Sequence, residues 1–179
     1  FNGLSAPLFP KSGSWRPGSA ADGGRVLLAD KNAQMIIPVS AAWPSNTKAS
    51  WRFRVSIQPT SEAVGVVQLV STDAQSMISI SVSDRQVRLT SVVDESEPTL
   101  VGSFDLSSNG GQQPSERRNF QECTVSLLHD VLVVAIDGAP LGATPVAGEG
   151  PLEARLQAQG GQVAFADLDI VEMQHHPPR

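Results

Sequence analysis

The chain has 179 residues and a formal net charge of −5, and its 13 lysines and arginines are spread along the whole length. A chain of this size can bury a hydrophobic core without disulfide or metal crosslinks. The scattered basic residues exclude the charged patch that nucleic acids and anionic membranes require. Cys123 is the single cysteine, which excludes an internal disulfide and a cysteine-rich zinc site.

The sequence contains no apolar run of the roughly 20 residues that a transmembrane helix needs. It starts at Phe1 rather than at a methionine, which is compatible with a processed, exported or membrane-tethered protein and equally with an arbitrary starting point. We therefore expect an extracytoplasmic protein, periplasmic or secreted, and leave open whether a tether precedes Phe1.

Short runs of alternating apolar and polar residues predict strands and exclude long helices. In WRFRVSI, residues 51–57, four apolar side chains alternate with Arg52, Arg54 and Ser56. Because side chains of a strand alternate between its two faces, one face is predicted to join the core and the other to meet water.

Two hairpins are predicted in the middle of the chain. The first joins the alternating runs of residues 78–82 and 87–89 through a turn near Asp84 and Arg85, and the second joins the runs of residues 123–127 and 132–136 through a turn at His129 and Asp130. Asp137 and Gly138 then form a further turn, since glycine tolerates a positive φ.

The last predicted strand changes phase. Val163 and Phe165 share one face, whereas Leu168 and Ile170 belong to the opposite phase. The strand must therefore either contain a bulge near residues 166–167 or be covered on both faces.

Several of these segments, taken in order, resemble the 3-keto-disaccharide hydrolase family. They are FNGL at residues 1–4, GSW at 13–15, WRFRVSI, VLVVAIDGAPLG at 131–142 and GPLEARLQAQGGQVAFADLDI at 150–170. The resemblance implies a concanavalin A-like jelly-roll β-sandwich of two antiparallel sheets. We expect residues 1–173 to form this single domain and residues 174–179 to form a polar tail.

The resemblance also implies sugar chemistry, but its catalytic residues have no match here. Members that act on sugars carry a Glu, Gln and Asp series on a central strand, where this chain has QSMISISVSD. Met77, Ser79 and Ser81 occupy the alternate positions, and Asp84 at the end is the only acid. We therefore predict no catalytic residue.

Candidate sugar-binding residues are Trp43 and Asp84. Of the three tryptophans, Trp43, which lies beside Pro44, is the best candidate for an exposed stacking platform, whereas Trp51 is in phase with the core. Together with Asp84 it would line a concave face of the sandwich.

Other candidate sites favour structural interpretations. Asp94, Glu95 and Glu97 suit a calcium site or a solvated turn. Asp167 and Asp169 suit either a groove or a polar outer face. His175 and His176 lack a third zinc ligand, and His129 lacks the partners of a catalytic triad. We expect no metal and no cofactor.

The sequence leaves two functions open. The first is a non-catalytic, extracytoplasmic interaction module that serves as an accessory or structural subunit and binds protein partners in an assembly. The alternative is a domain that binds or hydrolyses glycans, including (3-keto-)disaccharides, as the resemblance implies.

Overall fold

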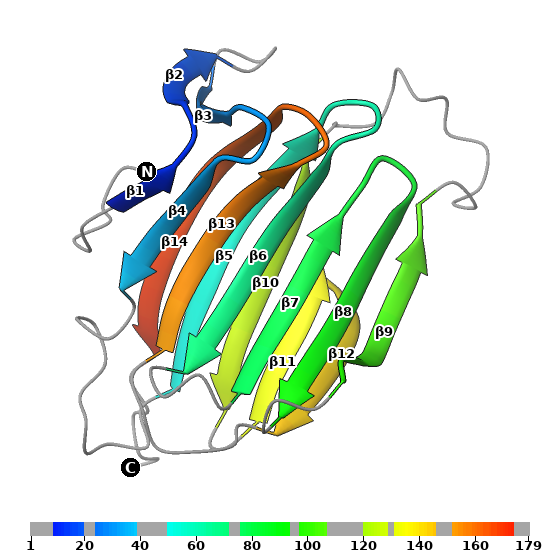
Figure 1. Cartoon of the computed structure of the whole chain (residues 1–179). Helices are drawn as coiled ribbons and strands as arrows, with labels where there is room; N and C mark the ends of the chain where they lie inside the picture. Colours follow the sequence, from blue (N-terminus) through cyan, green and yellow to red (C-terminus); the bar gives the residue numbers. More distant parts are fainter. Residues whose placement is uncertain are drawn as a thin grey trace.

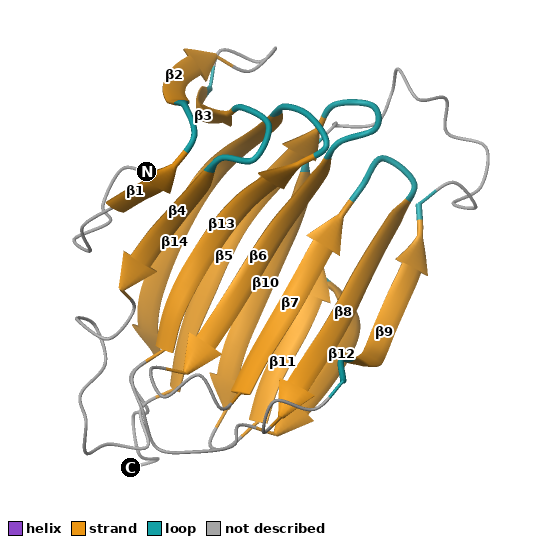
Figure 2. Ribbon diagram, in the orientation of Figure 1, coloured by secondary structure: helices purple, strands orange, loops and turns teal. Residues whose placement is uncertain are grey.

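A computed structural model describes residues 9–19, 24–38, 50–71, 76–93, 97–106, 120–128, 131–145 and 152–173. The described residues form strands and no helix (Figure 2), so none of them belongs to a helix long and apolar enough to span a membrane. The strands are β1 (Phe9–Ser12), β2 (Trp15–Ser19), β3 (Arg25–Ala29), β4 (Gln34–Pro38), β5 (Ser50–Pro59), β6 (Val64–Ser71), β7 (Ser76–Val82), β8 (Gln86–Val93), β9 (Thr99–Asp105), β10 (Gln121–Leu128), β11 (Val131–Ile136), β12 (Ala139–Pro145), β13 (Leu152–Gln159) and β14 (Val163–Met173).

These strands form two seven-stranded sheets that lie one behind the other (Figure 1). Sheet A has the order β1-β4-β13-β6-β7-β8-β9, and sheet B has the order β12-β11-β10-β5-β14-β3-β2. Neighbouring strands within each sheet are antiparallel. The predicted all-β sandwich of two antiparallel sheets is confirmed.

The core lies between the two sheets. Its largest fully buried side chains include Phe53 of β5, Phe165 of β14, Ile37 of β4 and Leu156 of β13. Each such side chain contributes roughly 1.5–3 kcal/mol when it leaves water. Both sheets supply these residues, so their inner faces are held together by apolar packing.

The alternation predicted for residues 51–57 is confirmed at residues 53, 55 and 57 and corrected at Ser56, and the side chain of Trp51 lies outside what the structure describes. Phe53, Val55 and Ile57 are completely buried, and Arg52 is exposed. Ser56, which we expected to meet water, is only 5% exposed, because it faces Asp167 on the neighbouring strand and its Oγ donates a hydrogen bond to Asp167 Oδ2 over 3.4 Å.

Both predicted hairpins are present. Strand β7 pairs with β8, and β10 pairs with β11. At the next turn Asp137 and Gly138 have φ values of 49° and 83°, the pair of positive angles that a two-residue turn with the right twist requires. Asp137 Oδ1 also accepts a hydrogen bond from the Glu122 backbone N–H at 2.8 Å.

The predicted bulge in the last strand is confirmed. The pairing of β14 with β5 shifts between Ala166 and Asp169, and Asp167 has a φ of 53°. The extra residue lets Leu168 return to the core, where it is 2% exposed.

One side of the sandwich is closed by two edge strands, β9 and β12. Each carries a bulge, since the register of β9 shifts at Val101 and that of β12 shifts at Leu141. A Cβ atom on Gly102 would lie 2.1 Å from the backbone oxygen of Leu141, and one on Gly142 would lie 3.0 Å from Cγ1 of Val101. The two bulges therefore face each other at backbone contact distance.

Candidate functional site

The outward side of sheet A, here called outer face A, carries the largest group of aligned polar side chains. On β6 the residues Val67 and Leu69 point into the core, so Gln68 points outward. The backbone pairing places Arg155 of β13, Gln68 of β6, Ser79 of β7 and Thr90 of β8 side by side. These four residues are called the central row.

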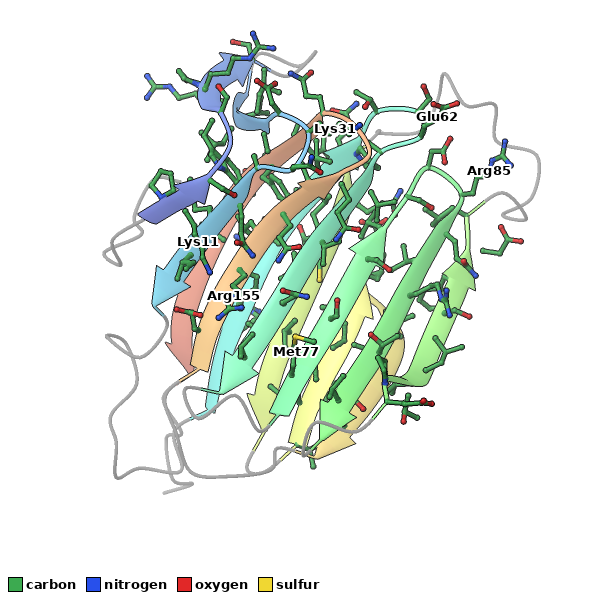
Figure 3. The ribbon with its side chains drawn as sticks, viewed as in Figure 1. Lys11, Lys31, Glu62, Met77, Arg85 and Arg155 are labelled. Atoms are coloured by element: carbon green, nitrogen blue, oxygen red, sulfur yellow. The ribbon has the colours of Figure 1, made fainter. Side chains whose placement is uncertain are left out.

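The rows on either side of the central row mix polar and apolar groups. One row contains Gln157, Val66, Ser81 and Arg88, and the other contains Glu153, Val70, Met77 and Val92. Val66 and Val70 are only 4% and 7% exposed although they point away from the core. Neighbouring side chains therefore cover them, and Figure 3 shows Arg155 and Met77 on the face that is turned toward the reader.

Hydrogen bonds hold the amide groups of outer face A in fixed positions. Gln157 Nε2 donates to Gln68 Oε1 at 2.9 Å, and Gln159 Nε2 donates to Gln157 Oε1 at 3.4 Å. The chain of amides leaves the Gln68 amino group without a protein acceptor in the described part of the chain. Ser79 and Thr90 likewise have no protein partner among the described residues, so their hydroxyls are available to a ligand.

The charged side chains on the strands that carry the central row, and on their neighbours β4 and β9, include equal numbers of cations and anions. Arg155 Nε lies 2.8 Å from Glu153 Oε2, and both side chains are about 30% exposed. Across the described parts of β4, β13 and β6–β9, Arg88 and Asp105 are the other charged side chains in outward positions. These strands therefore present two cations and two anions, and the edge strand β1 of the same sheet adds the exposed Lys11.

Strand β7, for which the resemblance led us to look for catalytic acids, presents none in its outward positions. Met77, Ser79 and Ser81 of β7 occupy its outward positions, as the alternation predicted. Asp84 lies after β7, exposed in the β7–β8 turn, where Ser83 Oγ accepts hydrogen bonds from the N–H groups of Arg85 and Gln86. Trp43 lies outside the described residues, so a shared site for Trp43 and Asp84 stays a prediction.

The outward side of sheet B, here called outer face B, holds the two acids of the last strand. Asp169 Oδ2 lies 3.3 Å from Arg54 Nη2, and Asp167 accepts the hydrogen bond from Ser56. Both carboxylates thus have partners on β5, which supports the polar outer face over a groove. Arg54 Nε is buried and has no hydrogen-bond partner among the residues that the structure describes.

The remaining candidates have structural surroundings or lie outside the described residues. The ring of Trp15 lies 5.8 Å from that of Phe165, so this tryptophan extends the core. Within the described ranges no three metal-ligating side chains gather. The three histidines and residues 94–96 are not among the described residues, and Glu97 is exposed.

Cys123 is inert in this environment. It is completely buried on β10, and burial, with smaller contributions from Asp137 and Glu122, raises the pKa of its thiol to about 12. A thiolate is the reactive form of cysteine, so Cys123 has no role in the candidate site.

The glutamines of outer face A were missed by the sequence analysis. Gln68 lies in VGVVQLV and Gln157 in EARLQAQ, 89 residues apart. Each is the polar residue of an otherwise apolar strand, which is a signal for an outward position. The signal does not say that the two strands are neighbours.

No protein-family model and no curated protein matches the chain. Among solved structures, a carbohydrate-binding module from Bacillus subtilis superposes with a TM-score of 0.55 and 9% identity, over 91% of this chain and 94% of that one. An alginate lyase of polysaccharide lyase family 7 gives a TM-score of 0.59 and 11% identity, over 90% and 85%. A protein of unknown function with a galectin-like fold, also from Bacillus subtilis, gives 0.51 and 8% over 93% and 88%.

At these identities the likeness shows the fold alone. The two stacked sheets and the three neighbours identify the chain as a concanavalin A-like jelly-roll β-sandwich. None of the three is described as a 3-keto-disaccharide hydrolase, so membership in that family stays a prediction.

Proposed function

We propose that this protein is a non-catalytic glycan-binding module and that outer face A holds the glycan. The observation that carries the proposal is the central row, where Gln68, Ser79 and Thr90 offer amide and hydroxyl groups that have no protein partner in the described chain. Sugar hydroxyls both donate and accept hydrogen bonds, as Ser and Thr hydroxyls do.

The carboxylates of outer face A support binding without hydrolysis. Glycoside cleavage needs two carboxyl groups separated by at most roughly 10 Å. Glu153 and Asp105 are four strand spacings apart, which corresponds to roughly 19 Å at the usual spacing. Glu153 is also held by Arg155, and the distance between the two acids is too large for them to act as the general acid and base of one site.

Three further predictions from the sequence stay attached to this proposal. Trp43 and Asp84 stay predicted sugar-binding residues of a concave face. An extracytoplasmic location, periplasmic or secreted, would expose the module to polysaccharides. Binding of protein partners in an assembly is the competing function, and the predicted polar tail of residues 174–179 lies outside the described residues.

Calorimetric titration of the purified chain with a panel of oligosaccharides tests the proposal. We expect at least one glycan to bind, and Gln68→Ala to weaken it by about tenfold, because one oriented amide is worth about 1 kcal/mol or slightly more. Gln58→Ala is the matched control, since Gln58 is a half-buried glutamine on β5 of the opposite sheet. Trp43→Ala and Asp84→Asn, titrated in parallel, test the predicted site residues.

Two results would refute glycan binding at outer face A. One is the absence of binding to every member of the panel by a chain that is folded by circular dichroism. The other is a bound glycan whose affinity changes equally, or not at all, in Gln68→Ala and Gln58→Ala. Recovery of a stoichiometric protein complex from the native source would then favour the assembly function.

A further inference from the structure

Resting on the proposed function, we infer that outer face A takes an uncharged, extended glycan chain of about four units that lies across the strands, rather than a terminal sugar or a polyuronate. Three features of the face carry this inference: the alignment of the central row, the residues at its two ends, and the balance of charge.

The central row runs perpendicular to the strands. Its residues Arg155, Gln68, Ser79 and Thr90 come from four neighbouring strands of sheet A, and neighbouring strands lie about 4.8 Å apart. A hexose unit in an extended chain has nearly the same length as this spacing. Consecutive units of one chain would therefore each meet one polar residue of the row.

Apolar residues end the row on both sides. Arg155 pairs with Ile36 of β4, and Thr90 pairs with Leu100 of β9. Leu100 is 50% exposed and contributes no hydrogen-bonding side chain. The polar part of the row is thus limited to four positions, which sets the expected length of the bound segment.

The charges at the central row do not favour the binding of an acidic glycan over an uncharged one. The only charged group in the central row is Arg155, and Glu153 neutralises it over 2.8 Å. Arg88 lies in the next row, and its formal charge is equal and opposite to that of Asp105 on β9. A polyuronate would bring one carboxylate per unit to a central row whose single cation is already neutralised, and each carboxylate would lose water on binding.

The test compares chain lengths and charges at this site. The probes are linear gluco- and manno-oligosaccharides of one to six units and oligomannuronates of the same lengths. We expect affinity for the neutral chains to rise by about a hundredfold from one unit to four and to change less than twofold beyond four. We expect the acidic chains to bind at least tenfold more weakly at each length.

A variant at the end of the row checks the direction of the chain. Thr90→Val should weaken the four-unit chain by about five- to tenfold and the two-unit chain by less than twofold, because the shorter chain occupies the remaining positions. Thr124→Val is the matched control, since Thr124 is half-buried on β10 and points to outer face B. We expect it to leave both affinities unchanged.

The outcomes separate this inference from the proposed function. Binding that depends on Gln68 but is equally tight for one and four units would mean a terminal-sugar site and would overturn the extended chain. Tighter binding of the acidic chains at equal length would overturn the uncharged class. Loss of all glycan binding, or its independence of Gln68, would instead overturn the proposed function itself.

Discussion

Outer face A and outer face B both cover seven-stranded sheets, but they use their polar groups differently. On outer face B the ion pair of Arg54 with Asp169 and the hydrogen bond of Ser56 with Asp167 join β5 to β14. On outer face A, Gln157 orients Gln68 and leaves its amino group free. Polar groups that pair with each other support the sheet, whereas groups that are oriented and unpaired are available to a ligand.

The largest expected effect concerns the core that both faces share. Replacing Phe165 with Ala should cost roughly 3–5 kcal/mol of unfolding free energy, because a completely buried aromatic ring leaves a cavity. Urea unfolding followed by fluorescence or circular dichroism measures the loss. An unchanged midpoint would show that β14 does not pack as described. The assignment of residues to outer face B would then be wrong.

A smaller loss is expected directly beneath outer face A. A Cβ atom on Gly65 of β6 would lie 2.4 Å from Cγ2 of Ile57 and 3.0 Å from Cγ1 of Val163, so Gly65→Ala should overpack the core by about 1–3 kcal/mol. Glycan affinity at 15 °C should change little, since Gln68 keeps its neighbours. A stabilised Gly65→Ala protein in the same urea experiment would contradict the packing of the two sheets at this point.

The next prediction follows from Cys123, whose neighbours Glu122 and Asp137 belong to sheet B and its turn. The pKa of the thiol is raised from 9.0 to about 12 in the folded chain, so between pH 9 and 12 the unfolded chain loses this proton and the folded chain keeps it. The free energy of unfolding should therefore fall as the pH rises. The equilibrium constant for unfolding should increase by up to about tenfold per pH unit. Cys123→Ala should lack this part of the slope, and an identical slope in both proteins would argue against the buried neutral thiol.

The smallest effect is expected on outer face B. The side chains of Arg54 and Asp169 are 38% and 39% exposed, so Asp169→Asn should cost about 0–1 kcal/mol and leave glycan affinity unchanged. A stability loss of several kcal/mol, or a loss of glycan binding, would show that this pair has a larger role than closing β5 against β14. The same titration with Gln68→Ala provides the contrast.

The local structure was largely predictable from the sequence, because its signals lie within a few residues. The alternation of apolar and polar residues predicted the inward positions of Phe53 and Val55. The change in that alternation within the last strand predicted the bulge near Asp167. The burial of Ser56 was not predictable, since its partner is 111 residues away. The candidate site has the same property: it requires β13 to lie between β4 and β6, and no short stretch of sequence specifies that order.

The facing bulges of β9 and β12 have a consequence for solubility. An edge strand presents unpaired backbone groups that can recruit the edge of another molecule, and a bulge disrupts the regular register that such pairing needs. Here the register is interrupted at Val101 in β9 and at Leu141 in β12. The backbone of the two bulges meets where Gly102 approaches the backbone oxygen of Leu141. The bulges thereby protect this side of the sandwich against aggregation, because its edge strands cannot pair in regular register with the edge strands of another molecule.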